Sequence, residues 1–300
     1  MKARNPSPSI FPLKASIGNC GSNDPADVKK FQNTISAAGY ELATRRALIT
    51  NGRCEFETIE AIRWYQRLLN LSPTGLLHPT DAWYMQLQAS LSPHWRPQHT
   101  VGILTVGEGQ ITFDAEGIDY VTAVEPFRQH RYPFFSRVLH WPGDNKSGVT
   151  LGRGYDMGSR GAGEIFVTLR RAGIEEDKAT ICSKAAFLRG KKAGLFVTVY
   201  GPLMGEITHQ QQTALFRISY REKQQYAQRL YSSMQRSPSW MMLDQRIKAV
   251  VVDIFYQGVS NPHGLFRAAA AGKAELIAFI LNDGGLMSYE PKRKRIGYLR

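Results

Sequence analysis

The sequence predicts a mainly α protein of the α+β class, with two domains and one small β-hairpin lobe. Its 300 residues are enough for two domains with a sizeable core, and 43% hydrophobic against 21% charged residues is an ordinary globular composition. Segments with apolar residues at helical spacing recur along the chain, bounded by helix-capping residues. One glycine-punctuated segment, SGVTLGRGYDMG at 147–158, instead predicts two short strands joined by a turn.

The chain divides into a small and a large domain. The large domain is expected to hold the hairpin lobe and a helical lobe around one buried central helix, because AVVVDIF (249–255) is apolar almost all round. The small domain is expected to contain three helices. The expected divisions are a flexible leader at 1–15, the small domain at 16–89, a linker with prolines and glycines at 90–113, and the large domain at 114–300.

Capping and turn residues predict the three N-terminal helices. Asp24 can cap the first helix, and Asn51–Gly52 forms the turn before the second. A turn at 72–75 precedes a short third helix with Trp83 and Leu87. The residues expected along the buried sides of the first two helices are Val28, Phe31, Gln32, Ile35, Ile59, Ile62, Tyr65 or Gln66, and Leu69.

The predicted hairpin brings a hydroxyl and a carboxylate together. Pairing its strands about Arg153 places Thr150 opposite Asp156, on the same face of the ribbon. Two such side chains can hold a water molecule between them. A hairpin alone fixes no chemistry, so a second acid from another element is needed to predict a function.

Glu125 is the second acid that the pattern favours. Asp114 can cap a helix that includes Val121 and Val124, and Pro126 favours an end to this helix at Glu125. Aromatic neighbours can dehydrate the carboxyl group and so favour its neutral form, as a general acid requires. Two carboxyl groups facing each other across a cleft are what hydrolysis of a glycosidic bond needs.

The remainder of the large domain is predicted to be helical, with one exception. GKKAGLFVTVYGP (190–202) reads as a loop with a short extended piece. Thr208 and Gln211 form a capping box that opens a long helix. The expected helices are 159–169 with Ser159 as its cap, 175–188, 208–231, 243–256 ending at Gly258, 264–270, 273–282, and a basic helix from Pro291.

Glu125 followed by SGVTLGRGYDMG resembles the Glu–Thr–Asp site of the pesticin-type, phage-lysozyme-like muramidases. The resemblance covers roughly 114–300 and implies a lysozyme-like domain in which Glu125, Thr150 and Asp156 are catalytic. The family spacing between acid and threonine is slightly shorter than here, and Glu116 and Glu108 lie further away and fit less well. The residues that the resemblance implies at the substrate are Tyr155, Asp253 and Gln257.

The N-terminal domain resembles the three-helix peptidoglycan-binding domain of many wall hydrolases. The resemblance rests on Val28–Phe31–Gln32, on the segment from Asn51 to Gln66, and on Thr74–Gly75; Asn51 and Cys54 depart from the commonest pattern. It implies binding of glycan by this domain. Arg53, Trp64 and Tyr65 are the residues that we select as glycan contacts.

Together the resemblances imply a glycoside hydrolase that cleaves the β-1,4 bond between N-acetylmuramic acid and N-acetylglucosamine. Glu125 is the expected acid, and Asp156 with Thr150 is expected to activate water, which implies inversion with carboxyl groups about 6.5–9.5 Å apart. Neither a metal nor an organic cofactor is expected. Peptidoglycan is the expected partner. A lytic transglycosylase and a non-catalytic wall-binding protein are the alternatives.

The net charge of +13 favours a polyanionic partner but does not choose among wall polymer, membrane surface and nucleic acid. No nucleic-acid motif appears and no apolar run is long enough to span a membrane, so neither nucleic acid nor membrane insertion is expected. A nucleic-acid binder remains an alternative that only the charge favours. The N-terminus lacks the apolar core of a cleavable signal peptide. We therefore expect a protein made in the cytoplasm and exported or injected into the periplasm or wall of a target bacterium.

This combination suits an antibacterial toxin, such as a type VI secretion effector, with a carrier protein in the secretion machine and a periplasmic immunity protein. A phage endolysin is the alternative. Cys20 and Cys54 either pair or stay as free thiols, and Cys182 is expected in the core. KRKR at 292–295 is either a solvated face or a surface for the anionic wall.

Overall fold

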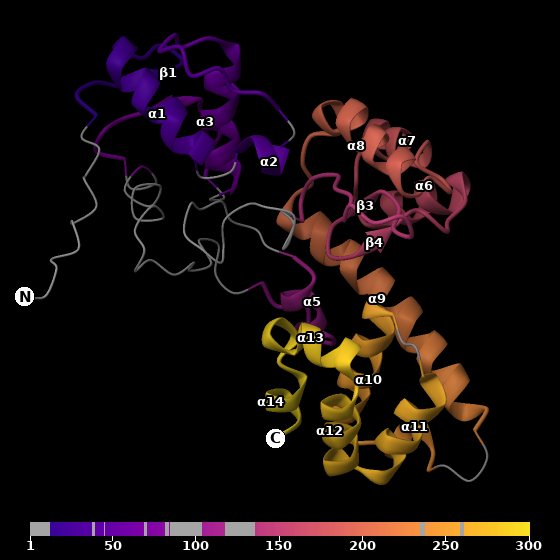
Figure 1. Ribbon diagram of the computed structural model, residues 1–300. Coiled ribbons are helices and arrows are strands. Elements are labelled where there is room, and N and C mark those ends of the chain that lie inside the picture. The colour runs from indigo at the N-terminus through magenta and orange to yellow at the C-terminus, as the bar shows by residue number, and fades with distance from the viewer. Residues whose placement is uncertain are drawn as a thin grey trace, which may run out of the picture. The chain divides into compact units, whose positions relative to one another are not determined.

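The computed structural model describes residues 13–37, 40–44, 46–68, 71–81, 84, 104–117, 136–234, 238–258 and 261–300. These residues are mainly helical, with two small antiparallel sheets (Figure 1). The mainly α class is therefore confirmed. Two compact units each combine distant stretches of the chain. Unit 1 comprises the described residues within 1–104, 118–147 and 190–206, and unit 2 those within 105–117, 148–189 and 207–300.

Unit 1 contains a small sheet and four helices within its described residues, and the sheet shares one hydrophobic core with the first three of these helices. Its elements are β1 (Ile17–Gly18), α1 (Pro25–Ala37), α2 (Tyr40–Thr44), α3 (Phe56–Leu68), β2 (Leu76–Leu77) and α8 (Lys191–Met204). Asp24 Oδ1 accepts the amides of Ala26 and Asp27, which confirms it as the cap of α1. Val28, Phe31 and Ile35 are buried, as predicted for that helix.

Two glutamines hold the glycine turns of unit 1. Gln32 Oε1 accepts the Gly52 amide at 2.9 Å, and its Nε2 donates to the Arg53 carbonyl at 2.9 Å. Gln66 repeats the arrangement at Gly75, whose amide it accepts at 3.0 Å. Both glycines have positive φ, which side chains rarely tolerate. Gln32 therefore holds the turn that precedes α3, and Gln66 holds the turn that precedes β2.

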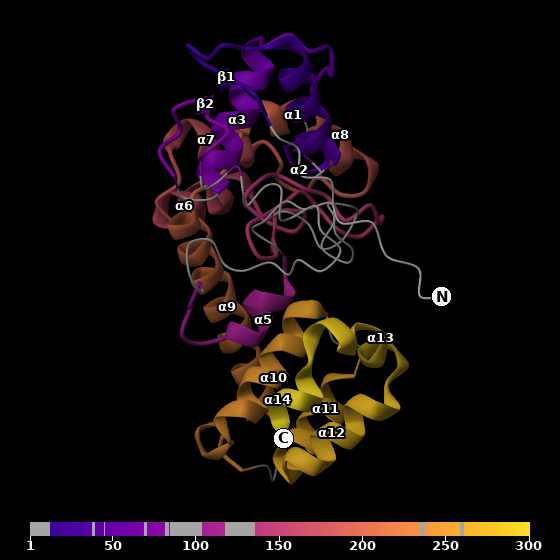
Figure 2. The ribbon, with the colours of Figure 1, turned by 90° about the vertical axis from the view of Figure 1, so that its left-hand side faces the viewer.

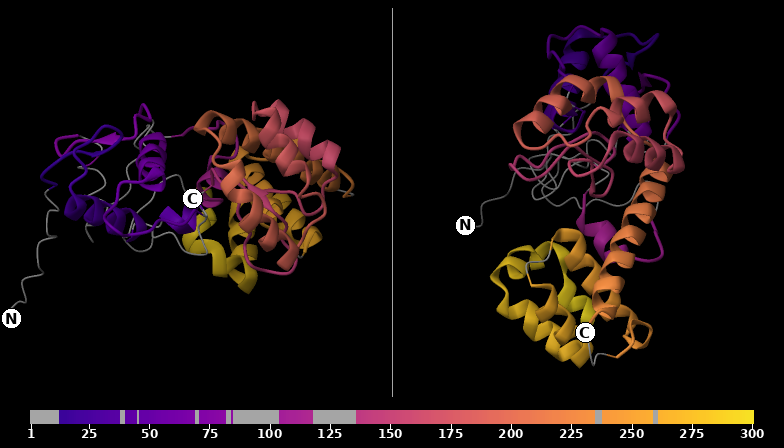
Figure 3. Two further views of the ribbon diagram at one scale, coloured as in Figure 1. Left: turned by 90° about the horizontal axis from the view of Figure 1, so that it is seen from above. Right: turned by 90° about the vertical axis from the view of Figure 1, so that its right-hand side faces the viewer.

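Unit 2 carries the hairpin and the longest of the described helices, α9. Figure 2 shows its last helices gathered around α10, at the end of α9 opposite the hairpin. Further views of the same arrangement are given in Figure 3. The elements are α5 (Gln110–Ala115), β3 (Thr150–Leu151), β4 (Tyr155–Asp156), α6 (Ala162–Arg171), α7 (Glu176–Ser183), α9 (His209–Ser232), a 3₁₀ turn (Trp240–Met242), α10 (Gln245–Gln257), α11 (Pro262–Ala271), α12 (Lys273–Asn282), α13 (Gly284–Arg293) and α14 (Arg295–Leu299).

The hairpin register is the predicted one. Thr150 pairs with Asp156 and Leu151 with Tyr155, in antiparallel strands. Gly152 and Gly154 adopt positive φ on either side of Arg153, which lets the chain reverse. The glycine spacing thus fixed both the turn and the pairing.

Helix α10 is the buried central helix that the sequence predicted. Asp244 caps it by accepting the Arg246 amide at 2.7 Å, and Gly258 follows its last residue. Its residues 250–255 are all buried, and it packs against α5, α9, α11 and α14. The capping box that opens α9 is also confirmed, because the side chain of Thr208 accepts the backbone amide of Gln211 and the side chain of Gln211 accepts that of Thr208.

Several expected boundaries are wrong. Asp114 lies inside α5, which begins after Gly109, so the expected boundary at 113/114 falls within a helix. Helix α6 begins after Gly161 and not after Ser159. Pro291 lies inside α13 rather than opening a basic helix, and a positive φ at Lys294 separates α13 from α14.

The segment 190–202 is not a loop but most of helix α8. Ala193, Phe196 and Val197 are buried at helical spacing, along with Met204 in the last turn. Glycines and β-branched residues lower the intrinsic helix propensity of this segment, and burial of one face compensates for it. The spacing of the apolar residues, and not their intrinsic propensity, therefore determines the structure of this segment.

Candidate functional site

The Thr150–Asp156 couple is anchored to the backbone at Gly148. Asp156 accepts the Gly148 amide at 3.1–3.2 Å and, through Oδ1, the Gly158 amide at 2.6 Å. Thr150 Oγ1 donates to the Gly148 carbonyl at 3.3 Å. A carboxylate offers about four acceptor positions, so Asp156 Oδ2 retains capacity for a further donor.

Among the described residues, Glu116 places its carboxyl group against the turn of the hairpin, at Gly154. It ends α5, and its side chain is only 14% exposed. A Cβ built on Gly154, in the hairpin turn, would lie 2.9 Å from Glu116 Oε2 and 2.6 Å from Tyr256 Cε1. Only a glycine leaves room for the carboxyl group at this point of the turn.

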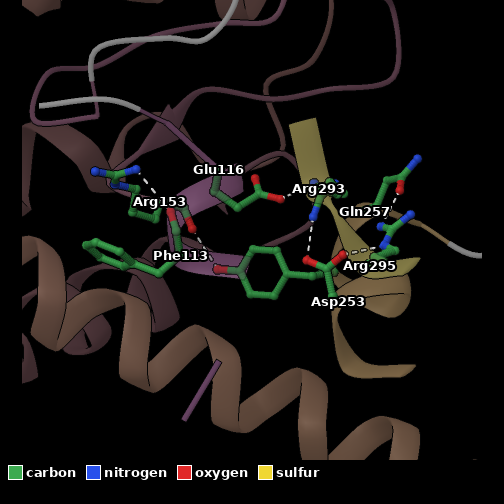
Figure 4. Close-up of polar contacts among 8 residues, drawn as sticks. Phe113, Glu116, Arg153, Asp253, Gln257, Arg293 and Arg295 are labelled. Carbon is green, nitrogen blue, oxygen red and sulfur yellow. Dashed lines mark hydrogen bonds and ion pairs between the residues drawn. The ribbon is translucent and has the colours of Figure 1, made fainter. Parts of the chain in front are cut away.

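Glu116 is tied to a buried network of opposite charges (Figure 4). Arg293 forms an ion pair with Glu116 and, through Nη1, with Asp253 at 2.6 Å. Arg295 binds the other oxygen of Asp253 at 2.6 Å and Gln257 Oε1 at 2.5 Å. Asp253 and Arg295 have no exposed side-chain surface. The network joins α5, α10 and the α13–α14 junction.

The expectation that KRKR is a solvated face is wrong for its two arginines. Arg293 and Arg295 are buried, at 4% and 0% exposure. Lys294 adopts a left-handed conformation between α13 and α14, and the arginines on either side of it both reach Asp253. A buried aspartate needs compensating cations, and these two arginines supply them.

Arg153 connects the hairpin turn to the end of α5. Its Nη1 donates to the carbonyls of Phe113, at 3.0 Å, and of Gly117. Its own carbonyl accepts the Tyr256 hydroxyl at 2.7 Å. Hairpin, α5 and α10 therefore meet at one residue.

Replacing Gly154 with alanine should destabilise unit 2 through a clash as well as through backbone strain. Gly173 has the same left-handed φ with open space around it, so Gly173→Ala measures strain alone, about 1–2 kcal/mol. Gly154→Ala should cost at least about 1 kcal/mol more, because Tyr256 or Glu116 must move. Urea denaturation of both variants measures the difference. Equal costs would mean that the turn is not packed against these side chains.

Lys292 makes the stability of this region depend on pH. Burial lowers the pKa of its amine from 10.5 to about 7; Glu116 opposes this shift, and the charges of Arg293 and Arg153 reinforce it. Between these pH values the unfolded chain holds a proton that the folded chain has released, so stability rises with pH. The stability of the wild type relative to Lys292→Met should therefore increase between about pH 7 and about pH 10 in urea titrations. A constant difference would contradict this.

The other predicted site residues are dispersed. Tyr155 is buried beneath the Arg160 guanidinium, 4.6 Å from the ring centre, and burial raises the pKa of its hydroxyl to about 12. Arg53 is exposed and lies 3.9 Å from Glu55. Glu125 lies outside the described residues, so its position stays a prediction.

Trp64 and Tyr65 are core residues of unit 1. They are 2% and 3% exposed, and the Trp64 ring packs edge-on against both Tyr40 and Tyr65. Cys20, Cys54 and Cys182 are free thiols, and Cys182 is buried as expected. Within the described ranges, no group of three metal-binding side chains is found and no helix is long and apolar enough to cross a membrane.

Sequence reasoning missed Glu116, Arg153, Arg293 and Arg295. Spacing along the chain favours Glu125, because Glu116 lies further from Thr150. A usable signal was Asp253, a lone acid in an apolar helix, which requires a cationic partner elsewhere in the sequence. The KRKR segment is the densest cationic run available to it.

The chain belongs to the family described as a domain of unknown function (DUF8812), whose model matches residues 109–270. The match begins at the residue that precedes α5 and ends in α11. It therefore includes Glu116, the hairpin and Asp253, whereas Arg293 and Arg295 lie beyond it. No curated protein matches the chain.

Proposed function

We propose that this protein is a muramidase, which hydrolyses the β-1,4 bond between N-acetylmuramic acid and N-acetylglucosamine in peptidoglycan. The observation that carries the proposal is the contact of a carboxyl group, Glu116, with the turn of the Thr150–Asp156 hairpin. An acid from one element and a hydroxyl–carboxylate couple from another are the parts that glycoside hydrolysis requires. The likeness of SGVTLGRGYDMG to the pesticin-type muramidases supports the same chemistry.

In this proposal Glu116 takes the role of the acid that the sequence had given to Glu125. Its Oε1 is held by Arg293, and its Oε2 is the oxygen that faces Gly154. A proton on Oε2 can pass to the leaving oxygen of the sugar. Asp156 Oδ2, with Thr150, orients the attacking water, and the reaction proceeds with inversion.

Unit 1 would supply affinity for the wall. The likeness of its sequence to the three-helix peptidoglycan-binding domain supports this role, and Gln32 and Gln66, which belong to that likeness, hold its glycine turns. Of the three residues selected as glycan contacts, Arg53 has an exposed side chain and is the one offered to a ligand. The biological role that fits is an antibacterial effector with an immunity protein and a secretion carrier, and a phage endolysin is the alternative.

Digestion of purified sacculi followed by mass spectrometry tests the chemistry. A muramidase releases muropeptides with reducing ends, and a lytic transglycosylase releases anhydro products. Binding to sacculi without either product would show a non-catalytic wall-binding protein. The whole proposal would be refuted if the protein neither bound to the sacculi nor cleaved them.

A further inference from the structure

The hairpin turn carries a buried arginine where a solvent-exposed residue would be ordinary. Arg153 is 4% exposed, and its guanidinium lies 4.3 Å from the centre of the Phe113 ring. Its Nε donates to Gln212 Oε1 on α9 at 3.4 Å. Burying a guanidinium is costly unless it is hydrogen-bonded, so the hydrogen bonds that Arg153 makes must offset the cost of its burial.

The two carbonyls that Arg153 binds flank Glu116. One belongs to Phe113, whose oxygen also accepts the Glu116 amide at 3.3 Å, and the other belongs to Gly117. The carbonyls at a helix C-terminus lack intrahelical donors and carry partial negative charge, so a cation is favourable there. Helix α5 has only six residues and is too short to persist alone. Arg153 therefore caps the C-terminal end of α5 by binding one carbonyl before Glu116 and one after it.

The turn itself is held in place. The Tyr256 hydroxyl donates to the Arg153 carbonyl at 2.7 Å, and Gly152 and Gly154 allow the left-handed conformations on either side. The backbone of Arg153 is thus fixed by α10, and its side chain by α5 and α9. A displacement of the hairpin would carry the main chain around Glu116 with it.

We propose that Arg153 is a positioning residue that keeps Glu116 in register with Thr150 and Asp156. It binds the main chain on both sides of Glu116 and does not act on the substrate. This inference rests on the proposed muramidase function. Arg153 aligns the acid with the hydroxyl–carboxylate couple because it is connected to both. Its side chain binds the main chain around Glu116, and its backbone forms the turn between the strands that carry Thr150 and Asp156.

Kinetics of Arg153 variants on soluble glycan strands test the proposal. Arg153→Met should lower kcat about 10–100-fold with KM nearly unchanged, because small misplacements of catalytic groups cost rate rather than binding. Arg153→Lys should recover part of kcat, since an ammonium can still donate to one of the carbonyls. Arg170→Met is the matched control, because Arg170 donates to the Ile174 carbonyl just beyond the end of α6. It should leave kcat unchanged.

Hydrogen exchange provides a readout that needs no activity. In Arg153→Met, peptides covering α5 and the hairpin should lose protection together, and in Arg170→Met they should not. An unchanged kcat, or equal kcat values in the Met and Lys variants, would overturn the positioning role. Unchanged exchange in both segments would overturn it as well. If Arg153→Met loses this protection but the wild type cleaves no glycan, the muramidase function is refuted, while the attachment of α5 to the hairpin through Arg153 stands.

Discussion

Replacing Asp253 with alanine should lower the free energy of unfolding by about 3–5 kcal/mol, because it leaves buried cations without their partner. Asp253 is fully buried and receives one bond from Arg293 and one from Arg295, each at 2.6 Å. Arg295 has no exposed surface with which to recover hydration. Urea denaturation followed by circular dichroism measures the loss.

A surface ion pair provides the control for Asp253. Lys273 and Asp244 lie 3.1 Å apart with both side chains well exposed, so Lys273→Met should cost less than about 1 kcal/mol. The double variant Asp253→Ala/Arg295→Met should lose less than the sum of the two single losses, because it also removes one of the two cations that Asp253 compensates. Strictly additive losses would show that Asp253 and Arg295 do not stabilise each other.

Replacing Glu116 with glutamine should abolish lysis while keeping the fold. A positioned general acid contributes about 100–10,000-fold to rate, and glutamine cannot supply the proton. Arg293 keeps its bond to Asp253 in this variant, so the network loses one ion pair and not its centre. Turbidity clearing of purified sacculi measures activity, and thermal unfolding verifies the fold.

Glu125→Gln, examined in parallel, distinguishes the two possible acids. If Glu116 is the acid, Glu125→Gln should retain most of the lytic activity. Loss of lysis in Glu125→Gln alone would return the role to Glu125 and keep the muramidase function. Lysis by both variants at wild-type rate would remove both carboxyl groups from the mechanism.

Local sequence rules predicted the parts of this protein that local chemistry determines. The glycine spacing in GVTLGRGYD gave the pairing of Thr150 with Asp156, and Thr208 with Gln211 gave the start of α9. The nearly continuous apolar run around Asp253 gave the buried helix. Each depends on residues within a few positions of one another.

Tertiary contacts between distant segments could not be predicted in the same way. The contact of Glu116 with Gly154 and the burial of Arg293 and Arg295 depend on how α5, α10 and α13 pack. Spacing along the chain favoured Glu125 because it says nothing about which side chain reaches the hairpin in space. The one local sign of these contacts was Asp253, because an aspartate in a buried apolar helix needs a cationic partner.

The burial of Arg295 beside Asp253 has a consequence for synthesis of the chain. The ribosome makes Asp253 some forty residues before it makes Arg295, the separation across which their hydrogen bond runs. Until Arg295 has left the exit tunnel, Asp253 must stay hydrated, and α10 cannot be enclosed. The helices around α10 therefore cannot pack completely until α13 and α14 have been made and have left the tunnel.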